Sequence, residues 1–165
     1  MATARAGVGG RAVELLRLAG PVGHSRDAAA ATRYRVEPYV AAGDVYQLPD
    51  GTARGGWTWY TCAAGWMYRA WLEEVLGIRV RGDRLCVAPV IPADWPGFGV
   101  RLRRGSALYE VVVENPDGVQ SGVALVQLDG RSMEGGVVPY LDDGAKQVVR
   151  VRMGAILAAD GEPGR

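Results

Sequence analysis

The candidate chemistry of this 165-residue chain begins with its only histidine, His24. It lies in the segment Gly-Pro-Val-Gly-His-Ser-Arg at residues 20–26, where two glycines and a proline predict a turn. A protonated imidazole in such a turn would be a natural ligand for phosphate. A lone histidine is more often a structural or surface residue, so the sequence leaves both interpretations open.

A second candidate is the glycine-rich stretch at residues 54–68, Arg-Gly-Gly-Trp-Thr-Trp-Tyr-Thr-Cys-Ala-Ala-Gly-Trp-Met-Tyr. Its glycine pair leads into a predicted helix, and the unpaired N–H groups at a helix N-terminus can bind an oxyanion. Thr61 could add its hydroxyl to that site, or it could simply cap its own helix. A cysteine hydrolase that pairs Cys62 with His24 is a weaker alternative, because only two unlinked residues support it. No Gly-Lys-Ser/Thr sequence follows, which disfavours a nucleotide P-loop.

A carboxylate and many aromatic rings suggest a third kind of site. Glu37 precedes Pro38 and Tyr39, so it could stabilise a helix start or accept hydrogen bonds from sugar hydroxyls. Aromatic side chains are concentrated just downstream, where they could form a core or line a sugar-binding cleft. These side chains belong to Trp57, Trp59, Tyr60, Trp66, Tyr68 and Trp71.

Composition excludes several other classes of function. The formal net charge is +1, so no global field would recruit nucleic acid or an anionic membrane. Two cysteines and one histidine are too few for a disulfide framework or a metal cluster, and we expect no metal and no cofactor. No apolar run approaches the roughly 18 residues needed to span a bilayer. The N-terminus does not resemble a signal peptide, so the expected compartment is the cytoplasm.

The first half of the chain has the pattern of short helices. Apolar residues at helical spacing predict a helix over 13–19 that Gly20 and Pro21 end. A second helix is predicted to start at Pro38, because proline favours the first helical position. Residues 48–56 predict a loop, and a third helix is expected from Thr61 to Gly77.

After Gly77 the apolar period becomes two, which predicts strands. Residues 78–87 form a candidate hairpin, and further short strands are separated by Asp-Gly and Asn-Pro turns, as in a β-sandwich. The expected fold class is therefore α+β. The predicted division is a disordered N-terminus at 1–10, a helical segment at 11–77, an all-β sandwich at 78–154 and a tail at 155–165.

Several motifs together resemble the C-terminal part of glycoside hydrolase family 94. This family contains cellobiose and chitobiose phosphorylases, β-1,2-oligoglucan phosphorylases and part of the cyclic β-1,2-glucan synthases. The Gly-Gly-Trp-Thr-Trp-Tyr-Thr sequence and the Leu-Asp-Asp-Gly ending at 141–144 are most similar to the synthase and β-1,2-oligoglucan branch. The matching motifs are Tyr-Arg-Val-Glu-Pro-Tyr-Val at 34–40, the stretch at 54–68, Ile-Pro-Ala-Asp-Trp-Pro-Gly-Phe at 91–98 and Val-Glu-Asn-Pro at 113–116.

The resemblance implies the last helices of an (α/α)6 barrel followed by a C-terminal β-sandwich. It also implies inverting phosphorolysis of β-linked glucans, with β-1,2-linked glucose favoured. In this reaction an acid protonates the glycosidic oxygen and inorganic phosphate attacks the anomeric carbon. His24, Thr61 and Cys62 align with the family's phosphate cradle, and Glu37 and Tyr39 with its substrate-binding motif. The ring of His24 and the hydroxyl of Thr61 should then lie roughly 5 to 8 Å apart, because one phosphate and a hydrogen bond on each side of it must fit between them.

The sequence also departs from the family pattern. Cys62 stands where relatives have glycine, and residues 41–43 lack the glutamine of the cellobiose phosphorylases. Asp27, Asp44 and Asp50 match nothing in the catalytic-acid motif, so we expect a fragment, from a shortened reading frame or a split gene, that is inactive alone. Its expected partners are a β-glucan, inorganic phosphate, and either the missing barrel portion or a second copy of the chain. If the whole protein is a cyclic glucan synthase, we expect it to be attached to the inner membrane. The alternative is a non-catalytic β-sandwich that binds carbohydrate or a partner.

Overall fold

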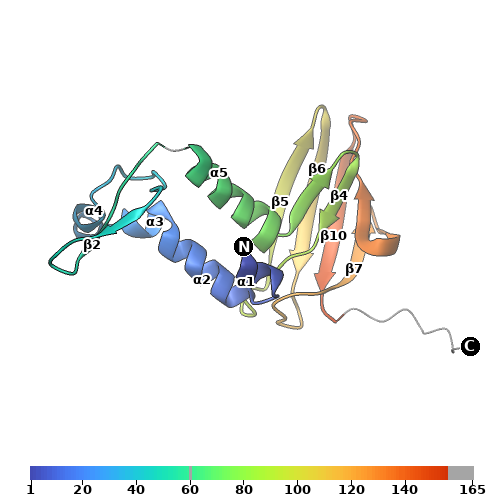
Figure 1. Cartoon of the computed structure of the whole chain (residues 1–165). Coiled ribbons are helices and arrows are strands. Elements are labelled where there is room, and N and C mark those ends of the chain that lie inside the picture. Colours follow the sequence, from blue (N-terminus) through green and yellow to red (C-terminus); the bar gives the residue numbers. More distant parts are fainter. Residues whose placement is uncertain (60, 156–165) are drawn as a thin grey trace, which may run out of the picture.

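The chain is a mixed α+β protein, with helices in its first half and sheets in its second (Figure 1). The computed structural model describes residues 1–59 and 61–155, and the side chain of Thr61 is outside that description. The helical elements are α1 (Ala2–Arg5), α2 (Gly9–Ala19), α3 (Pro21–His24), α4 (Ala28–Tyr34), α5 (Thr61–Arg69) and the π-helical turn η1 (Ala70–Val75). The expected α+β class is therefore confirmed.

Helix α2 follows the predicted amphipathic pattern, with Ala12 and Val13 buried and Arg11 paired with Glu14 on the solvent side. Its first residue, Gly9, lies against the backbone of the second half. A Cβ at Gly9 would stand 2.2 Å from the carbonyl oxygen of Ile91, a distance that no side chain tolerates. The absence of a side chain at Gly9 thus allows α2 to lie directly against the chain that follows β4.

The predicted helix starting at Pro38 is wrong. The helix of this region is α4, which begins nine positions after the last residue of α2 and stops at Tyr34. Asp27 caps it, because its Oδ1 accepts a hydrogen bond of 2.7 Å from the backbone N–H of Ala30. Arg35 ends it in the left-handed conformation, at φ 54°, and Pro38 falls in a turn.

The predicted loop at 48–56 is partly a hairpin. Strands β1 (Val45–Gln47) and β2 (Ala53–Gly55) pair in antiparallel register, with Tyr46 opposite Arg54. The turn between the two strands, Pro-Asp-Gly-Thr at residues 49–52, agrees with the loop that the proline and glycines predict. Both strands are short and mostly exposed, so they carry no strong alternation of apolar residues.

Helix α5 and η1 together form the predicted third helix, which ends at Val75, two residues before Gly77. Gly77 has φ 68°, and a Cβ there would lie 2.0 Å from the carbonyl oxygen of Ala88. The backbone N–H of Ala88 donates to the Gly77 carbonyl, and that of Val90 donates to the Val75 carbonyl. The end of the helix is therefore tied to the segment that follows the first hairpin of the second half.

The second half contains two sheets that share one buried cluster. The five-stranded sheet has the order β5-β6-β10-β7-β8, in which only β6 and β10 are parallel, and the smaller sheet has the order β3-β4-β9. The strands are β3 (Ile78–Arg81), β4 (Arg84–Val87), β5 (Gly97–Arg104), β6 (Ala107–Glu114), β7 (Val123–Leu128), β8 (Arg131–Ser132), β9 (Val137–Pro139) and β10 (Lys146–Met153). A 3₁₀ turn, η2 (Glu134–Gly136), precedes β9.

Alternate residues of β6 point into this cluster and are almost fully buried, as period-two patterning predicts. Leu85 of β4 and Val138 of β9 belong to the same cluster from the smaller sheet. In Figure 1, β4 accordingly crosses in front of β6 and β10. Two buried side chains fix the adjoining loops: Asn115 bonds the backbone of Trp95 and Val119, and the Tyr109 hydroxyl bonds the backbone of Leu141.

The prediction of a disordered segment at residues 1–10 is wrong, because this segment includes α1 and the start of α2. Ala4 is buried in the cluster, and the guanidinium of Arg5 binds the carboxylate of Glu74. These contacts supply the burial and hydrogen bonding that a composition of Ala, Arg and Gly does not reveal. No helix in the described part of the chain is long and apolar enough to cross a membrane.

Candidate functional site

The candidate site residues lie at the end of the helical half that is farther from the sheets, around α3, α4 and the β1–β2 hairpin (Figure 1). Four surface grooves occur there, with volumes of about 570, 720, 820 and 360 Å³. We name the first three by their residues: the arginine groove (Arg33, Arg35 and Arg54), the aromatic groove (Glu37, Tyr46 and Trp57) and the junction groove (His24, Tyr34 and Trp95).

His24 is the last residue of α3 and lines the junction groove. Its ring stacks on Tyr34, with centroids 4.5 Å apart and planes 11° from parallel. Its Nε2 lies 2.6 Å from the carbonyl oxygen of Leu18, and because a carbonyl can only accept, Nε2 must carry the proton. The imidazole is thus held in one orientation, and Nδ1 is the atom left to bind a ligand.

Cys62 is the second residue of α5, and its side chain is exposed. It lines the 360 Å³ groove with Asp44, Trp57 and Trp66, whereas His24 lines the junction groove. The structure does not place the two side chains in one groove. The side chain of Thr61 lies outside the described residues, so the expected distance between His24 and Thr61 stays a prediction.

Glu37 is bonded to one of the exposed aromatic residues. Its Oε1 accepts a hydrogen bond of 3.1 Å from the indole N–H of Trp59. Hydrogen bonds from its own backbone N–H and from this indole hold the pKa of Glu37 below its usual range. A carboxylate kept ionised in this way can accept hydrogen bonds from hydroxyls, but it is a poor proton donor.

Tyr39 and Trp59 are displayed to solvent on strained backbone. Their exposed fractions are 84% and 75%, and their φ angles are 72° and 61°. Left-handed backbone is uncommon for aromatic residues and is found most often at functional sites. Trp57 is exposed as well, and the ionised Glu37 bonds Trp59, so this segment displays aromatic faces on which a sugar ring could stack beside a carboxylate that accepts from its hydroxyls.

None of the three aspartates in this region has the environment of a catalytic acid. Asp27 caps α4, Asp44 accepts from the backbone N–H of Trp57 at 2.7 Å, and Asp50 accepts from both the backbone and hydroxyl of Thr52. The hydrogen bonds from Ala30 and Thr52 lower the pKa of Asp27 and of Asp50, respectively. A general acid needs a raised pKa, so Asp27 and Asp50 are unsuited to that role, and the carboxylate of Asp44 serves a backbone N–H in a turn.

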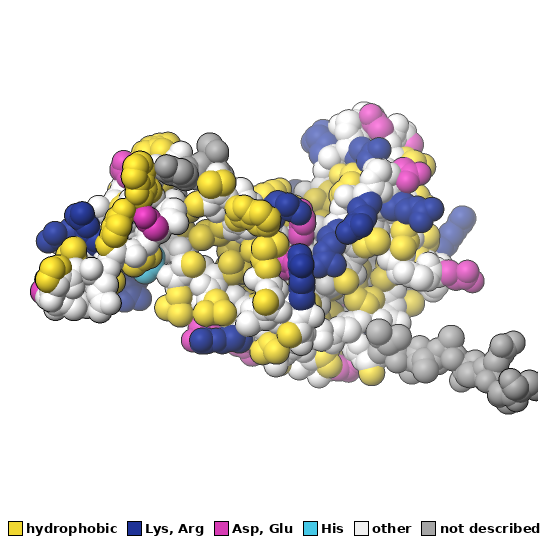
Figure 2. All heavy atoms as spheres, viewed as in Figure 1, with side chains coloured by type: hydrophobic (Ala, Val, Ile, Leu, Met, Phe, Trp, Pro, Cys, Tyr) yellow, Lys and Arg dark blue, Asp and Glu magenta, His cyan; other side chains and the backbone are white. Residues whose placement is uncertain are grey.

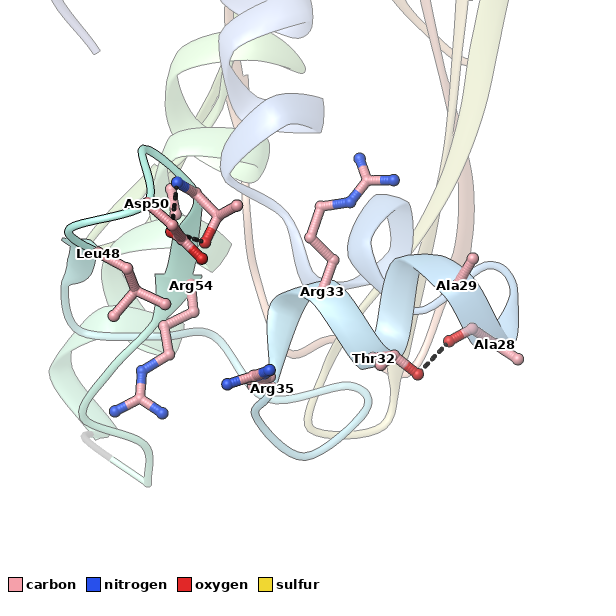
Figure 3. Close-up of a pocket in the computed structure, with 10 residues that line it drawn as sticks. Ala28, Ala29, Thr32, Arg33, Arg35, Leu48, Asp50 and Arg54 are labelled. Carbon is pink, nitrogen blue, oxygen red and sulfur yellow. Dashed lines mark hydrogen bonds between the residues drawn. The ribbon is translucent and has the colours of Figure 1, made fainter.

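Sequence reasoning missed the arginine groove. Arg33 and Arg35 flank the tyrosine of the matching motif, and Arg54 opens the glycine-rich stretch, but their separation in the sequence concealed their proximity. Figure 3 shows Arg35 at the end of α4 and Arg54 on β2, on either side of the open space between these two elements. Within residues 1–59 and 61–155, no group of three or more His, Cys, Asp and Glu side chains could hold a metal ion.

Comparison with known proteins defines the class to which the helical half belongs. Residues 1–77 match the family model described as "Glycosyl hydrolase 94 superfamily, catalytic domain". The chain is thus a member of glycoside hydrolase family 94 through these residues, and it falls near the cyclic glucan synthase branch.

Particular relatives extend the match beyond Gly77. The cyclic beta-(1,2)-glucan synthase NdvB of Rhizobium meliloti (strain 1021) is 43% identical over 113 residues, which are 68% of this chain and 4% of NdvB. The N,N'-diacetylchitobiose phosphorylase of Vibrio proteolyticus is 39% identical over 98 residues, 59% of this chain and 12% of the relative. The solabiose phosphorylase of Paenibacillus borealis is 33% identical over 120 residues, 71% of this chain and 15% of the relative. The chain therefore spans only a small part of each of these relatives.

Proposed function

We propose that this chain supplies part of the phosphate and sugar sites to a family 94 enzyme that phosphorolyses, or in reverse builds, a β-linked glucan. The 43% identity to a β-1,2-glucan synthase favours β-1,2-linked glucose as the substrate. In this proposal α2, α4 and α5 belong to an (α/α)6 barrel that ends at Gly77, and the sheets form a β-sandwich beside it.

The observation that carries the proposal is the hydrogen bond between Glu37 and Trp59 on an exposed aromatic surface. Phosphorolysis requires a sugar to be held by its hydroxyls and ring faces while phosphate approaches the anomeric carbon from the opposite side. Glu37, Tyr39 and Trp59 would hold the sugar. Phosphate would be bound by His24 through Nδ1, by Thr61, and by the backbone N–H of Cys62.

Phosphate brings its own negative charge as the nucleophile, so this chemistry needs no general base in the chain. It does need an acid for the glycosidic oxygen, and Asp27, Asp44 and Asp50 are occupied as caps and turn acceptors. The acid would come from the larger part of the enzyme that the relatives possess. The chain alone is therefore expected to release no sugar phosphate.

The test is complementation. The chain is mixed with the remainder of a family 94 phosphorylase from which the region corresponding to residues 1–154 has been removed, and glucose 1-phosphate release is measured from β-1,2-oligoglucan and inorganic phosphate. Cellobiose and N,N'-diacetylchitobiose serve as alternative substrates. Phosphate-dependent release by the mixture, absent from each part alone, is the expected result. Release of glucose 1-phosphate by the chain alone would contradict the proposal. The proposal would also be contradicted if the two parts fold and associate but the mixture releases no sugar phosphate from any of the β-linked substrates.

A further inference from the structure

Strand β5 is an open edge of the five-stranded sheet, and it is longer than the other edges of the two sheets. It has eight residues, whereas β8, at the opposite edge of the same sheet, has two. The edges of the smaller sheet are β3, with four residues, and β9, with three residues that include Pro139. Short edge strands and prolines prevent edge-to-edge pairing in natural proteins. Strand β5, at the left of the sheet in Figure 1, is neither short nor interrupted by proline.

Alternate residues of β5 direct their backbone groups away from the sheet. The N–H of Asn115, just after β6, donates to the carbonyl of Pro96, just before β5, and this bond fixes which residues of β5 bond to β6. The residues that face the open side are Gly97, Gly99, Arg101 and Arg103. In the described part of the chain, the one partner of their outward groups is the Tyr140 hydroxyl, which donates to the Arg103 carbonyl at 3.1 Å. The strand therefore offers a row of backbone donors and acceptors to another extended chain.

The two faces of β5 differ in chemistry. Arg101 lies opposite Glu110 of β6, on the outer face of the sheet, and its side chain is 78% exposed. The alternate residues Phe98, Val100 and Leu102 are only partly buried and pack against the buried cluster. A strand that pairs with this edge must therefore be apolar on its inner face and must leave room for arginines on its outer face.

A second copy of β5, running antiparallel, meets both conditions in one register. With Val100 opposite Val100 of the partner subunit, Arg101 lies opposite Gly99 of the partner subunit, and the outward backbone groups of the two strands bond to each other. A slip of two residues would place Arg101 opposite Arg101 of the partner subunit, and like charges directly opposite each other destabilise a sheet. A slip of one residue would turn the apolar face outward. The sequence of β5 thus selects a single self-complementary register.

In this register Arg103 gains an acidic partner. Arg103 lies opposite Gly97 of the partner subunit, and Gly97 is paired with Glu114 within its own sheet. Glycine has no side chain to intervene, and the two strand spacings between Arg103 and Glu114 of the partner subunit, about 9.5 Å, are within the combined reach of the two side chains. Glu114 is 61% exposed, and its ion pair with Arg150 is long, at 3.7 Å. Arg103 forms no ion pair with any described residue.

We infer that β5 pairs with β5 of a second copy of this chain, with Val100 on the two-fold axis, so that two five-stranded sheets become one continuous sheet. Each copy contributes the same surface, as in other two-fold symmetric interfaces. The interface uses none of the residues of the proposed phosphate and sugar sites. It goes beyond the proposed function, and its success or failure is independent of that function.

The first test is the oligomeric state of the full chain, measured by sedimentation velocity over a concentration series. A species of twice the 17.6 kDa chain mass is expected. Arg101→Pro should raise its dissociation constant at least about tenfold, because proline deletes one outward N–H from each copy and no hydrogen bond to β6. Arg101→Gln is the matched control, since it removes the same guanidinium but keeps the N–H, and it should dimerise like the wild type.

Two results of this test would overturn the inference. One is a wild-type chain that stays monomeric up to about 1 mM, the weakest association worth assigning to an interface. The other is an Arg101→Pro dimer as tight as that of Arg101→Gln, with native circular dichroism spectra for both variants. In the second case the interface lies elsewhere on the chain.

A charge exchange tests the register. Arg103→Glu places two carboxylates together across the interface and should weaken dimerisation at least about tenfold, whereas Arg131→Glu, the same reversal at an exposed position on β8, should not. The double variant Arg103→Glu, Glu114→Arg should restore dimerisation to near the wild-type level. Failure of the double variant to recover, in a chain with a native spectrum, would overturn this register.

Hydrogen exchange measured by NMR then locates the contact. The outward amides of Gly99 and Arg101 should exchange at least about tenfold more slowly at concentrations where the dimer forms than in the monomer. A dimer in which both amides stay unprotected would overturn the pairing of β5. Protection that appears only when the remainder of a family 94 enzyme is added would also overturn it, and would assign the edge to a strand of that partner.

Discussion

Arg5 donates to both carboxylate oxygens of Glu74, through Nε at 2.9 Å and Nη2 at 2.8 Å, although the two residues are 69 positions apart in the sequence. Glu74 is 4% exposed and also receives a 3.4 Å contact from Arg79 of β3. The carboxylate therefore joins α1, η1 and β3 at the seam between the helical half and the sheets. Figure 2 shows dark blue side chains over this seam, beside the magenta of acidic groups.

Replacing Glu74 should loosen this seam. In Glu74→Gln the bidentate ion pair becomes at most one hydrogen bond from Arg5 to a neutral amide oxygen, and we expect the free energy of unfolding to fall by about 1.5–3 kcal/mol. Urea titration monitored by tryptophan fluorescence measures this loss. Glu73→Gln is the control, because Glu73 pairs with Arg69 on the same helix in a more exposed position and should cost less. Equal losses of stability in the two variants would show that the ion pair between Glu74 and Arg5 of α1 does not stabilise the fold.

The same pair should make stability depend on pH. The hydrogen bonds from Arg5 lower the pKa of Glu74 below its ordinary value of 4.5, so the folded state binds this proton less readily than the unfolded state. The stabilisation is complete above the unfolded pKa and is lost as pH falls through the folded pKa. The stability gap between the wild type and Glu74→Gln should accordingly be constant from pH 7 to about 5.5 and shrink below about 4.5. A gap that widens toward pH 3 would contradict this assignment.

Gly65, which lies within α5, and Gly77, which lies beyond the end of η1, should respond oppositely to alanine. Gly77 has φ 68° and no room for a Cβ beside the Ala88 carbonyl, so Gly77→Ala should destabilise the fold by at least about 1–2 kcal/mol, the cost of left-handed backbone alone. Gly65 lies within α5 with open space around its Cβ position. Gly65→Ala should stabilise by about 0.5–1 kcal/mol through higher helix propensity. Thermal melts of the two variants check both signs.

The second half of the fold is the part that sequence patterns predict best. The run from Leu108 to Val113, which is rich in β-branched residues, and the Gly82-Asp83 turn are local signals, and they correspond to β6 and to the β3–β4 hairpin. The parallel pairing of β6 with β10 has no local signal, because it brings Lys146 opposite Leu108, which lies 38 positions earlier in the sequence. Such register is decided by the shared core and not by neighbours in sequence.

The helical half is harder to predict, because its helix boundaries and the order of its N-terminal residues depend on contacts between residues that are distant in the sequence. Asp27 followed by alanines is a cap signal for α4, yet Pro38 offered a competing one. The order in residues 1–10 depends on Glu74, which the N-terminal sequence cannot reveal. For the site, the resemblance to family 94 singled out Glu37 and His24, but the hydrogen bond between Glu37 and Trp59 and the arginine groove arise only when the chain folds back.

The last prediction concerns His24 in the complemented enzyme. Its Nε2 is committed to the Leu18 carbonyl, so Nδ1 would donate to phosphate as the imidazolium. His24→Ala removes this charge-assisted hydrogen bond, worth about 1.5–3 kcal/mol, and should raise the KM for phosphate about tenfold to hundredfold. Cys62→Gly keeps the backbone N–H, removes a side chain near the anion, and should leave the phosphate KM unchanged or lower it.

The control for His24→Ala is the KM for the glucan, which should not change if His24 acts on phosphate alone. Tyr34→Leu removes the ring on which His24 stacks and keeps the imidazole, so it tests whether orientation matters. We expect a smaller increase in the phosphate KM for Tyr34→Leu than for His24→Ala. Unaltered phosphate kinetics in His24→Ala would remove His24 from the phosphate site, and an equal rise in both KM values would indicate that the histidine only maintains the packing around α3 and α4.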